Sequence, residues 1–370
     1  MDFNDILEMV VQKKASDLFI TADMPPSLKI HGRIQPVSKT RLDAAQSREL
    51  TLSLMTPEQR DEFLHTKECN FAFTAKNVGR FRVSAFVQRD AVGMVLRRIE
   101  TRIPTFEELG LPPTLHELAL ANRGIVFFVG ATGTGKSTSL AAMVGYRNHN
   151  STGHIISIED PIEFLHNHAG CIVTQREVGI DTESYEVALR NTLRQAPDVI
   201  LIGEIRTREA MEHAITFAET GHLVLTTLHA NNANQALDRM LHFFPEEQHD
   251  QVLMDLSLNL RGIVAQQLLP RPDGKGRRAI MEIMLNTPLA SDLIQKGDVP
   301  KLKELMKRST EQGMITFDQA LYDAYRRGDV TQEDALRYAD SSNEVRLMIK
   351  LGDTSPNALN REASNLKFTD

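Results

Sequence analysis

The spacing of apolar residues divides the chain near residue 123. Before this point, apolar residues first recur three and four positions apart, which predicts an amphipathic helix over residues 3–14. Short β-like segments follow and predict strands at 17–21, 27–32, 69–75, 79–89 and 93–99, with helical stretches at 42–55 and 57–65. We therefore expect a small α+β domain over residues 1–99.

Beyond residue 123, continuous apolar runs alternate with helical segments. The runs are "GIVFFVG", "HIISIED", "DVILIGEI" and "HLVLTTL". This rhythm is typical of a mostly parallel sheet that is covered by helices on both faces. It predicts an α/β core over residues 123–287, joined to the first domain by a proline-containing linker at 100–122. The pattern then predicts a helical region at 288–349 and a polar, aperiodic tail at 350–370.

The composition is that of a soluble globular protein and narrows the possible classes. Of the 370 residues, 41% are hydrophobic and 25% are charged, and the net charge is -7. This acidic balance argues against a general nucleic-acid binder, which usually carries a basic face. The sequence has no apolar run of about 18 residues, so no membrane span is predicted. Cys69 and Cys171 fit no metal-binding spacing, which favours a reducing, cytoplasmic compartment.

The segment "GATGTGKST", residues 130–138, lies between a predicted buried strand and a predicted helix. It matches the phosphate-binding loop G-x-x-x-x-G-K-[ST], in which glycines let backbone N–H groups approach phosphates and the following helix adds partial positive charge. Lys136 would reach the β- and γ-phosphates, and the Ser137 hydroxyl would ligate Mg²⁺. The expected nucleotide-binding residues are Gly130, Thr132, Gly133, Thr134, Gly135, Lys136, Ser137 and Thr138.

Two acidic segments come at the ends of predicted strands. In "DVILIGEIR", Glu204 follows Gly203 at the place where P-loop enzymes hold Mg²⁺, and a glycine there would let the nucleotide or a metal-bound water approach closely. In "SIEDPIEF", a carboxylate such as Glu163 could orient or deprotonate the attacking water. The alternatives are an acid that complements a helix start for Glu204, and a turn that begins at Asp160 for the second segment.

Two histidines, His222 and His229, flank the apolar run "LVLTTL". An imidazole can donate a hydrogen bond to a phosphate, so this pair could sense the γ-phosphate. The alternative is a pair of structural histidines with satisfied hydrogen bonds. The spacing alone leaves both interpretations open.

Arginines occur in three sets. Arg80 and Arg82 alternate with apolar residues, which places both guanidinium groups on one face of a strand. The other sets are Arg190 with Arg194, four residues apart on one helix, and Arg206 with Arg208. An arginine that reaches a phosphate can neutralise transition-state charge, whereas a solvated or ion-paired surface position is the alternative for each of them.

Four segments now stand in a fixed order: "GATGTGKST", "IISIEDPIEF", "LRQAPDVILIGEIR" and "TGHLVLTTLHANNA". This order resembles the Walker A motif, Asp box, Walker B motif and His box of the secretion-ATPase superfamily, the motors of type II and type IV secretion and of type IV pili. The segments "ASDLFITADMPPSLKIHGRIQPV" and "GMITFDQAL" are similar to the pilus retraction ATPases of the PilT/PilU family. At residues 289–306 the chain departs from the PilT pattern, and the segment "VLTTLHANNANQALDRMLHFFP" and the polar tail are more similar to the PilU branch.

The resemblance implies a PAS-like N-terminal domain, a RecA-like ATPase domain and a ring of six chains. It implies ATP hydrolysis with Mg²⁺, the metal being held by Ser137 and, through water, by the Walker B acid Glu204. The implied catalytic residues are Glu163, Glu204, Lys136, His222, His229, Arg80 and Arg82. Of these, Glu163 would be the general base, the histidines would sense the nucleotide, and one of the two arginines would reach it.

The implied function is a motor that powers pilus retraction and twitching motility. Such a motor would work at the cytoplasmic face of the inner membrane through an integral-membrane platform protein, together with a PilT paralogue. It would bind no nucleic acid and would contact the membrane only indirectly.

Three alternatives remain at this point. The departure at 289–306 keeps open a nucleotide-binding structural booster with negligible ATP turnover. A RecA-like nucleic-acid motor is allowed by the P-loop alone, but the negative net charge and the order of the four segments oppose it. Assembly motors of the superfamily usually carry an extra N-terminal domain and a four-cysteine zinc site, which two cysteines cannot build, so retraction is preferred to extension.

Overall fold

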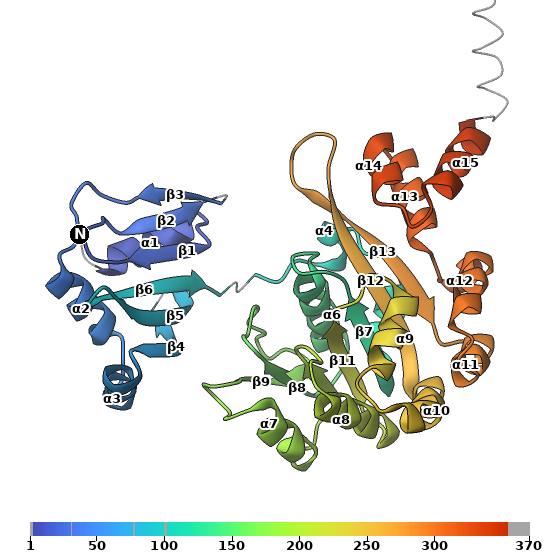
Figure 1. Cartoon of the computed structure of the whole chain (residues 1–370), viewed down its shortest axis with the longest axis horizontal. Coiled ribbons are helices and arrows are strands. Elements are labelled where there is room, and N and C mark those ends of the chain that lie inside the picture. The colour runs from blue at the N-terminus through green and yellow to red at the C-terminus, as the bar shows by residue number, and fades with distance from the viewer. Residues whose placement is uncertain (1–2, 31, 77, 100–101, 354–370) are drawn as a thin grey trace, which may run out of the picture. The chain divides into compact units, whose positions relative to one another are not determined.

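The computed structural model describes residues 3–30, 32–76, 78–99 and 102–353. These residues form two compact units (Figure 1). Unit 1 comprises residues 3–103 together with Pro161–His166 and Arg176–Ser184, and unit 2 comprises Pro104–Asp160, Asn167–Gln175 and the rest of the described chain from Tyr185. Of the tail expected at 350–370, residues 354–370 lie outside the described part.

Unit 1 is built on an antiparallel sheet whose strands follow the order β3-β2-β1-β6-β5-β4. The strands are β1 (Asp17–Ile20), β2 (Ser27–Ile30), β3 (Arg33–Pro36), β4 (Glu68–Ala75), β5 (Gly79–Gln88) and β6 (Ala91–Arg98), and the helices are α1 (Phe3–Gln12), α2 (Ala44–Ser53) and α3 (Pro57–Thr66). The expected α+β domain is therefore confirmed. Strand β3 was not predicted, because it lies at the sheet edge with all four residues exposed and so lacks an alternating pattern.

The pleat of β5 separates its apolar and basic residues. Phe81, Val83 and Ala85 are buried in the core of unit 1, whereas Arg80 and Arg82 are only partly buried. The two arginines therefore share the face opposite the core residues, as the alternation predicts.

Unit 2 contains a sheet of order β13-β12-β7-β11-β10-β8-β9. Its strands are β7 (Gly124–Val129), β8 (Gly153–Glu159), β9 (Cys171–Glu177), β10 (Val199–Ile202), β11 (Leu223–Leu228), β12 (Leu260–Pro270) and β13 (Arg277–Leu285). Strands β12, β7, β11, β10 and β8 pair in parallel, and β13 is antiparallel to β12. The strands that the four apolar runs predict are thus confirmed, whereas the β12–β13 hairpin was not predicted.

The order of the central strands matters for the site. Strand β11 pairs with β7 on one side and with β10 on the other. The strand that ends before Glu204 is therefore the second neighbour of the P-loop strand, and the strand that ends before His229 is the first. Sequence periodicity identifies strands but not their order, which the crossover connections decide.

Helices α6 (Lys136–Asn150), α7 (Tyr185–Thr192), α8 (Arg208–Glu219), α9 (Ala233–Leu241) and α10 (His249–Asn259) connect or follow these strands. Short helices α4 (Phe106–Leu109) and α5 (Thr114–Ala119) pack against α6 and bury Phe106, Leu111, Leu115 and Leu118 in the core of unit 2. Residues 104–122 of the expected linker are therefore part of the α/β unit. Their prolines limit helix length, but their apolar residues still join the core.

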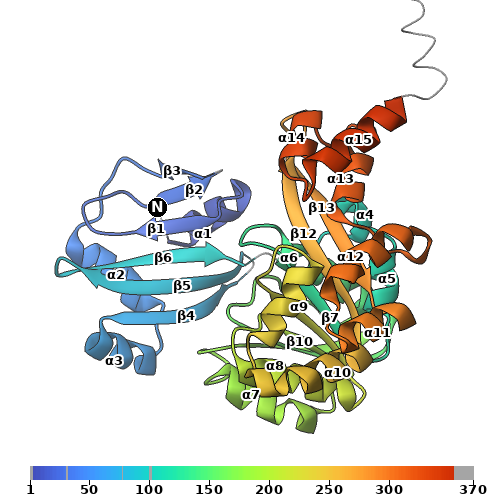
Figure 2. The ribbon, with the colours of Figure 1, turned by 45° about the vertical axis from the view of Figure 1, so that its right-hand side comes forward.

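The region from residue 288 is helical, as expected, with α11 (Pro288–Gln295), α12 (Val299–Arg308), α13 (Phe317–Arg326), α14 (Gln332–Arg337) and α15 (Ser342–Asp353). Helix α11 packs against α10, and α13 packs against β13, so this region continues unit 2 (Figure 2). Three 3-10 turns complete the elements: Leu193–Gln195, Glu246–Gln248 and Thr310–Gln312. Within the described ranges, no helix is both long and apolar enough to cross a membrane.

Candidate active site

The P-loop joins the end of the buried strand β7 to the start of α6. Gly133 and Gly135 have φ angles of 81° and 85°, a left-handed conformation that favours glycine. Gly135 is the N-cap of α6 and supplies no side-chain cap, so the first N–H groups of this helix are left for another acceptor. This arrangement is a ready anion site at a helix N-terminus.

Gln266 supports the P-loop from β12, and no motif in the sequence points to it. Its side-chain Nε2 donates to the Thr134 carbonyl at 2.8 Å, and the residue is buried. A Cβ added at Gly130 would lie 2.6 Å from the Gln266 carbonyl oxygen, and one added at Gly135 would lie 2.9 Å from Gln266 Nε2. The two glycines are therefore required by the close approach of β12, as well as by the loop itself. Only the pairing of β12 with β7 reveals this contact.

Lys136 begins α6 and turns its ammonium group back over the loop. Its Nζ donates to the carbonyl oxygens of Gly130 and Ala131 at 2.7 and 2.9 Å. The next residue, Ser137, is half-buried in the first turn of the helix. A cationic group and a hydroxyl thus stand beside the N-terminus of α6, which is the donor set that a nucleotide phosphate with Mg²⁺ requires.

The remaining P-loop residues differ in exposure. Thr132 and Gly133 are exposed, while Thr134 and Thr138 are half-buried. The Thr134 hydroxyl donates to the Ala131 carbonyl at 2.9 Å, which closes the loop on itself.

Glu204 and His229 meet at the carboxyl ends of β10 and β11. Glu204 Oε1 lies 2.8 Å from His229 Nε2, and the Glu204 side chain is 17% exposed. Arg206 Nε donates to the other oxygen, Oε2, at 2.9 Å. The parallel register pairs Ile202 with Thr226, so the residues just beyond the two strands are brought together. The structure therefore unites the candidate Walker B acid with one of the two candidate histidines.

Gly203 has a packing role that the sequence did not indicate. A Cβ at this position would lie 2.9 Å from the Tyr185 hydroxyl oxygen and 3.2 Å from Glu159 Cα. The Gly203 carbonyl also accepts a hydrogen bond from the Thr227 hydroxyl at 2.7 Å. The space in front of Gly203 is therefore taken by α7 and the end of β8, where we had expected a nucleotide or a metal-bound water.

Tyr185 was also missed, because a tyrosine in "TESYEVALR" matches no motif. Burial raises its pKa, and the negative charges of Asp160 and Glu159 add to that effect. Arg206 and a hydrogen bond with the backbone of Glu204 act in the opposite direction. The Tyr185 phenol therefore stays protonated at neutral pH, and its hydroxyl group occupies the space beside Gly203.

His222 lies at the other end of β11 from His229. Its carbonyl accepts from the Gly124 N–H at the start of β7, and its Nδ1 lies 3.0 Å from the Phe217 carbonyl oxygen. The P-loop follows the opposite end of β7, roughly 20 Å away for a strand of this length. The structure thus separates His222 from the P-loop and from His229, and gives it a structural hydrogen bond at the end of α8.

Glu163, Arg80 and Arg82 belong to unit 1, whereas the P-loop, Glu204 and His229 belong to unit 2. Glu163 is exposed. Within unit 1, burial raises the pKa of Glu177, and a hydrogen bond from the Ile162 N–H and the positive charges of Arg82 and Arg80 oppose that rise. The two arginines therefore stand near a carboxylate of their own unit.

Two of the remaining arginines, Arg190 and Arg208, have local partners. Arg190 pairs with Glu186 one turn away on α7, and Arg194 is exposed. Arg208 Nε donates to Glu212 Oε1 at 2.7 Å, and its guanidinium lies over the Phe244 ring. These contacts favour surface and packing roles for this group.

A hollow of about 440 Å³ adjoins the P-loop and the segment after β11. Its lining includes Gly130, His229, Asn231, Gln235 and Arg239. A larger hollow of about 740 Å³ lies between residues 110–113, β13 and α13, and its lining contains no P-loop residue. Because phosphate chemistry requires the P-loop, the smaller hollow is the relevant one. Among the described residues, no group of three or more His, Cys, Asp or Glu side chains could enclose a metal.

Residues 1–337 match the family described as Type II/IV secretion system protein. The chain belongs to this family. Within it, the chain is 69% identical over 355 residues to the type IV pilus ATPase PilU of Pseudomonas aeruginosa, with 96% of this chain and 93% of that protein covered. It is 38% identical to the type IV pilus retractation ATPase PilT of the same organism, with 90% and 97% covered.

Among solved structures, the crystal structure of the pilus retraction motor PilT with bound ADP is 38% identical and matches with a TM-score of 0.87. The match covers 93% of this chain and 98% of that one. The resemblance of the four ordered segments to the PilT/PilU family is thus confirmed, as is the two-domain fold of mixed α/β class.

Proposed function

We propose that this secretion-system protein is an ATP-hydrolysing motor that powers type IV pilus retraction. The observation that carries the proposal is the alignment of three neighbouring parallel strands, β7, β11 and β10, which end in the P-loop, His229 and Glu204. This brings a phosphate cradle and a carboxylate held by a histidine to one edge of a single sheet, where α/β proteins bind their ligands. The similarity to PilU and PilT supports the assignment to pili.

The chemistry follows from the residues. The N-terminus of α6 and the Lys136 ammonium bind the phosphates of ATP, and Lys136 exchanges its P-loop carbonyl partners for them. Ser137 and Glu204 would hold Mg²⁺, with Glu204 acting through water, and the metal would neutralise charge on the phosphates. Water then attacks the γ-phosphate, and the protein contributes positioning and charge neutralisation. Glu204 and Glu163 share the task of orienting or deprotonating this water.

His229 is proposed to report the nucleotide state. It contacts Glu204 at 2.8 Å and lines the hollow beside Gly130. A phosphate that competes with Glu204 for the imidazole would move the segment that follows β11. The Arg206 side chain, which is 60% exposed, forms an ion pair with the second oxygen of Glu204 from the solvent side.

The assembly is proposed to be a ring of six chains at the cytoplasmic face of the inner membrane. There it would act on a membrane-embedded platform protein and assist a PilT paralogue, with one arginine of the pair Arg80 and Arg82 reaching nucleotide. The accessory role rests on residues 289–306, which form most of α11 and most of α12 and depart from the PilT pattern.

ATP hydrolysis is tested by phosphate release from the wild type, Glu204→Ala and the control Glu247→Ala. Glu247 is an exposed acid on a short turn and has no role at the site. We expect a drop of about a hundredfold or more for Glu204→Ala and a change below about twofold for Glu247→Ala. Equal, near-zero rates in the wild type and Glu204→Ala would instead support a nucleotide-binding booster without turnover.

The accessory role is tested by deleting the gene alone and together with a PilT paralogue, and by scoring pilus retraction. Retraction that persists in the single deletion and stops in the double deletion supports it. Complete loss of retraction in the single deletion would contradict it.

A further inference from the structure

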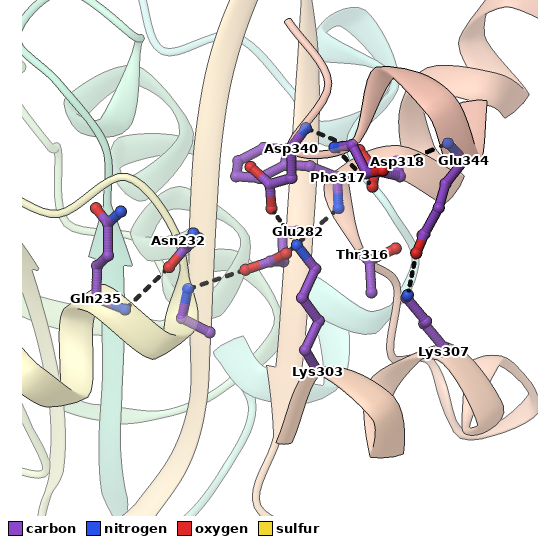
Figure 3. A network of polar contacts seen from close by, with 12 residues as sticks. Asn232, Gln235, Glu282, Lys303, Lys307, Thr316, Phe317, Asp318, Asp340 and Glu344 are labelled. Carbon is purple, nitrogen blue, oxygen red and sulfur yellow. Dashed lines mark hydrogen bonds and ion pairs between the residues drawn. The ribbon is translucent and has the colours of Figure 1, made fainter. Parts of the chain in front are cut away.

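A buried carboxylate, Glu282, joins the N-terminal ends of two helices that are far apart in the sequence (Figure 3). Its Oε1 accepts from the Ala233 N–H, the first of α9, at 2.9 Å. Its Oε2 accepts from the Phe317 N–H, the first of α13, at 3.3 Å. Helix α9 begins four residues after His229, and α13 belongs to the C-terminal helical region.

The position of this acid is unusual for a strand. Glu282 is 3% exposed on β13, within the apolar run "AIMEIML". A carboxylate there costs free energy unless its oxygens find hydrogen-bond donors. Ala233 and Phe317 are both fully buried, so their N–H groups cannot reach water and need an acceptor. The Glu282 carboxylate therefore accepts a hydrogen bond from the first N–H group of each of the two helices.

Each of the two helices already has an ordinary cap. The Asn232 side chain accepts from the Gln235 N–H at 2.9 Å, and the Thr316 hydroxyl accepts from the Gln319 N–H at 3.4 Å. Glu282 therefore provides what neither cap does, because its two hydrogen bonds connect the ends of the two helices directly.

The surrounding charges act on this carboxylate in opposite directions. Burial raises the pKa of Glu282 to about 7, the two N–H donors and Lys303 lower it, and Asp340 raises it further. Lys303 on α12 pairs with Asp340 at 2.6 Å, and Asp318 on α13 accepts from the Asp340 N–H at 2.8 Å. At the start of α9, the Ala233 N–H donates to the carboxylate, and the neighbouring residues Asn232 and Gln235 are uncharged (Figure 3).

A protonated carboxyl group has one oxygen that donates, so it cannot accept well from both N–H groups. One of the two helix starts would then lose its acceptor. Because burial raises the pKa of Glu282 to about 7, the tie weakens as the pH falls through neutrality.

The segment between His229 and α9 is short and held at both ends. His229 contacts Glu204 at one end, and Glu282 binds the Ala233 N–H at the other. Between them, the Asn231 N–H donates to Gln235 Oε1 at 3.3 Å. The placement of the α9 start therefore restrains where His229 can lie.

We propose that Glu282 is a positioning residue that holds the His229 segment against Glu204 and ties it to the C-terminal helical region through α13. Movement of this segment on ATP turnover is thereby passed to α12–α15, and changes in that region act back on the site. The coupling rests on the proposed ATPase function, whereas the restraint on α9 does not.

The test uses Glu282→Gln in the full chain, with Lys303→Met and Lys307→Met as a matched pair. Both lysines lie on α12 and pair with acids near or in α15, but only Lys303 acts on Glu282. In Glu282→Gln the amide keeps one acceptor and turns NH₂ toward the second N–H, so one contact is lost. Lys307→Met removes a comparable ion pair and leaves Glu282 unchanged.

The first readout is hydrogen exchange, which requires no ATP hydrolysis. We expect peptides spanning 229–241 and 313–326 to exchange faster in Glu282→Gln than in the wild type, and to be unchanged in Lys307→Met. Faster exchange at 313–326 alone would overturn the proposal, because Glu282 would then brace only the C-terminal region. An inactive wild type with the expected exchange pattern would defeat the ATPase assignment and leave the restraint standing.

The second readout is the pH profile of steady-state ATP hydrolysis. Loss of positioning should lower kcat of Glu282→Gln about tenfold and leave KM for ATP within about twofold, since the phosphate-binding residues lie on the P-loop and α6. The wild-type inflection near neutral pH should disappear in Glu282→Gln and move to higher pH in Lys303→Met. A folded Glu282→Gln with the wild-type kcat and pH profile would overturn the proposal, and the Lys303→Met profile decides the case if Glu282→Gln fails to fold.

Discussion

Glu204 and His229 lie 2.8 Å apart at the ends of two neighbouring parallel strands. Neither residue is close to the other in the sequence, and each follows an apolar run that is fully buried. Their contact places the His229 imidazole beside the Glu204 carboxylate, which is proposed to bind Mg²⁺ through water. It also links the P-loop neighbour β11 to the strand beyond it, so the site spans three strand ends.

The contact predicts that His229→Ala impairs turnover more than ATP binding. Loss of the imidazole frees one oxygen of Glu204 and leaves the segment before α9 without its anchor. We expect kcat for ATP hydrolysis to fall about tenfold or more, with KM changed by less than about threefold. His249→Ala is the control, because His249 begins α10, its Nε2 lies 3.0 Å from the Phe244 carbonyl oxygen, and it contacts no site residue. An unchanged kcat in His229→Ala would remove the histidine from the mechanism.

Gln266 should affect ATP binding through the shape of the P-loop. In Gln266→Ala the Thr134 carbonyl loses its donor and the loop loses its support from β12. A lost hydrogen bond of about 1 kcal/mol predicts that KM for ATP rises roughly threefold to tenfold, while kcat changes less. Gln267→Ala is the matched control, since successive residues of a strand face opposite ways. Equal effects of the two substitutions on KM would contradict this role.

Gly203→Ala is predicted to destabilise the fold even without nucleotide. The new methyl group would meet the Tyr185 hydroxyl at 2.9 Å and backbone atoms of β8 at 3.2 and 3.3 Å. Overpacking of this kind costs about 1–3 kcal/mol of unfolding free energy, which urea denaturation measures. Combining it with Tyr185→Ala should give a smaller loss than the sum of the two single changes, because the closest contact is gone. Strict additivity would show that Tyr185 is not the obstacle.

Glu282 should leave a signature in the pH dependence of stability. Its pKa is raised from 4.5 to about 7 in the folded protein. Below pH 4.5 the group is protonated in both states; as the pH rises toward 7, the unfolded chain has released its proton while the folded chain still holds it. The folded state therefore loses stability across this window, by about 3 kcal/mol relative to Glu282→Gln.

This difference is measured by comparing denaturation of the wild type and Glu282→Gln at pH values from about 4.5 to 8. Glu247→Gln, which changes an exposed acid on a short turn, is measured alongside as the control. A constant difference for Glu282→Gln would show that the carboxyl group titrates normally.

Much of the site was readable from local patterns. The strand–loop–helix context of "GATGTGKST" predicted the P-loop, and the observed β7, P-loop and α6 follow it residue by residue. Glu204 was predicted because an acid that follows a buried run must lie at a strand end. Such predictions succeed when a motif and its immediate flanks determine backbone conformation together.

Other features depend on contacts between distant segments. Gln266 and Tyr185 carry no motif and matter only because β12 lies beside β7 and α7 lies beside Gly203. His222 and His229 looked alike in sequence, since both flank one strand, yet that strand separates them by its whole length. In the sequence, Glu282 is a single acid in an apolar run, and only the fold shows that it accepts hydrogen bonds from the first N–H groups of α9 and α13.

The sequence by itself thus determined most of the strands and helices, the phosphate-binding loop and the family, because these depend on hydrophobic period, turn chemistry and ordered motifs within short stretches. Only the tertiary structure decided the strand order, which histidine meets Glu204, why Gly203 has no side chain, and what Glu282 joins. The physical reason is that hydrogen bonds and close packing between residues dozens of positions apart are set by how strands and helices are brought together, which no local pattern encodes.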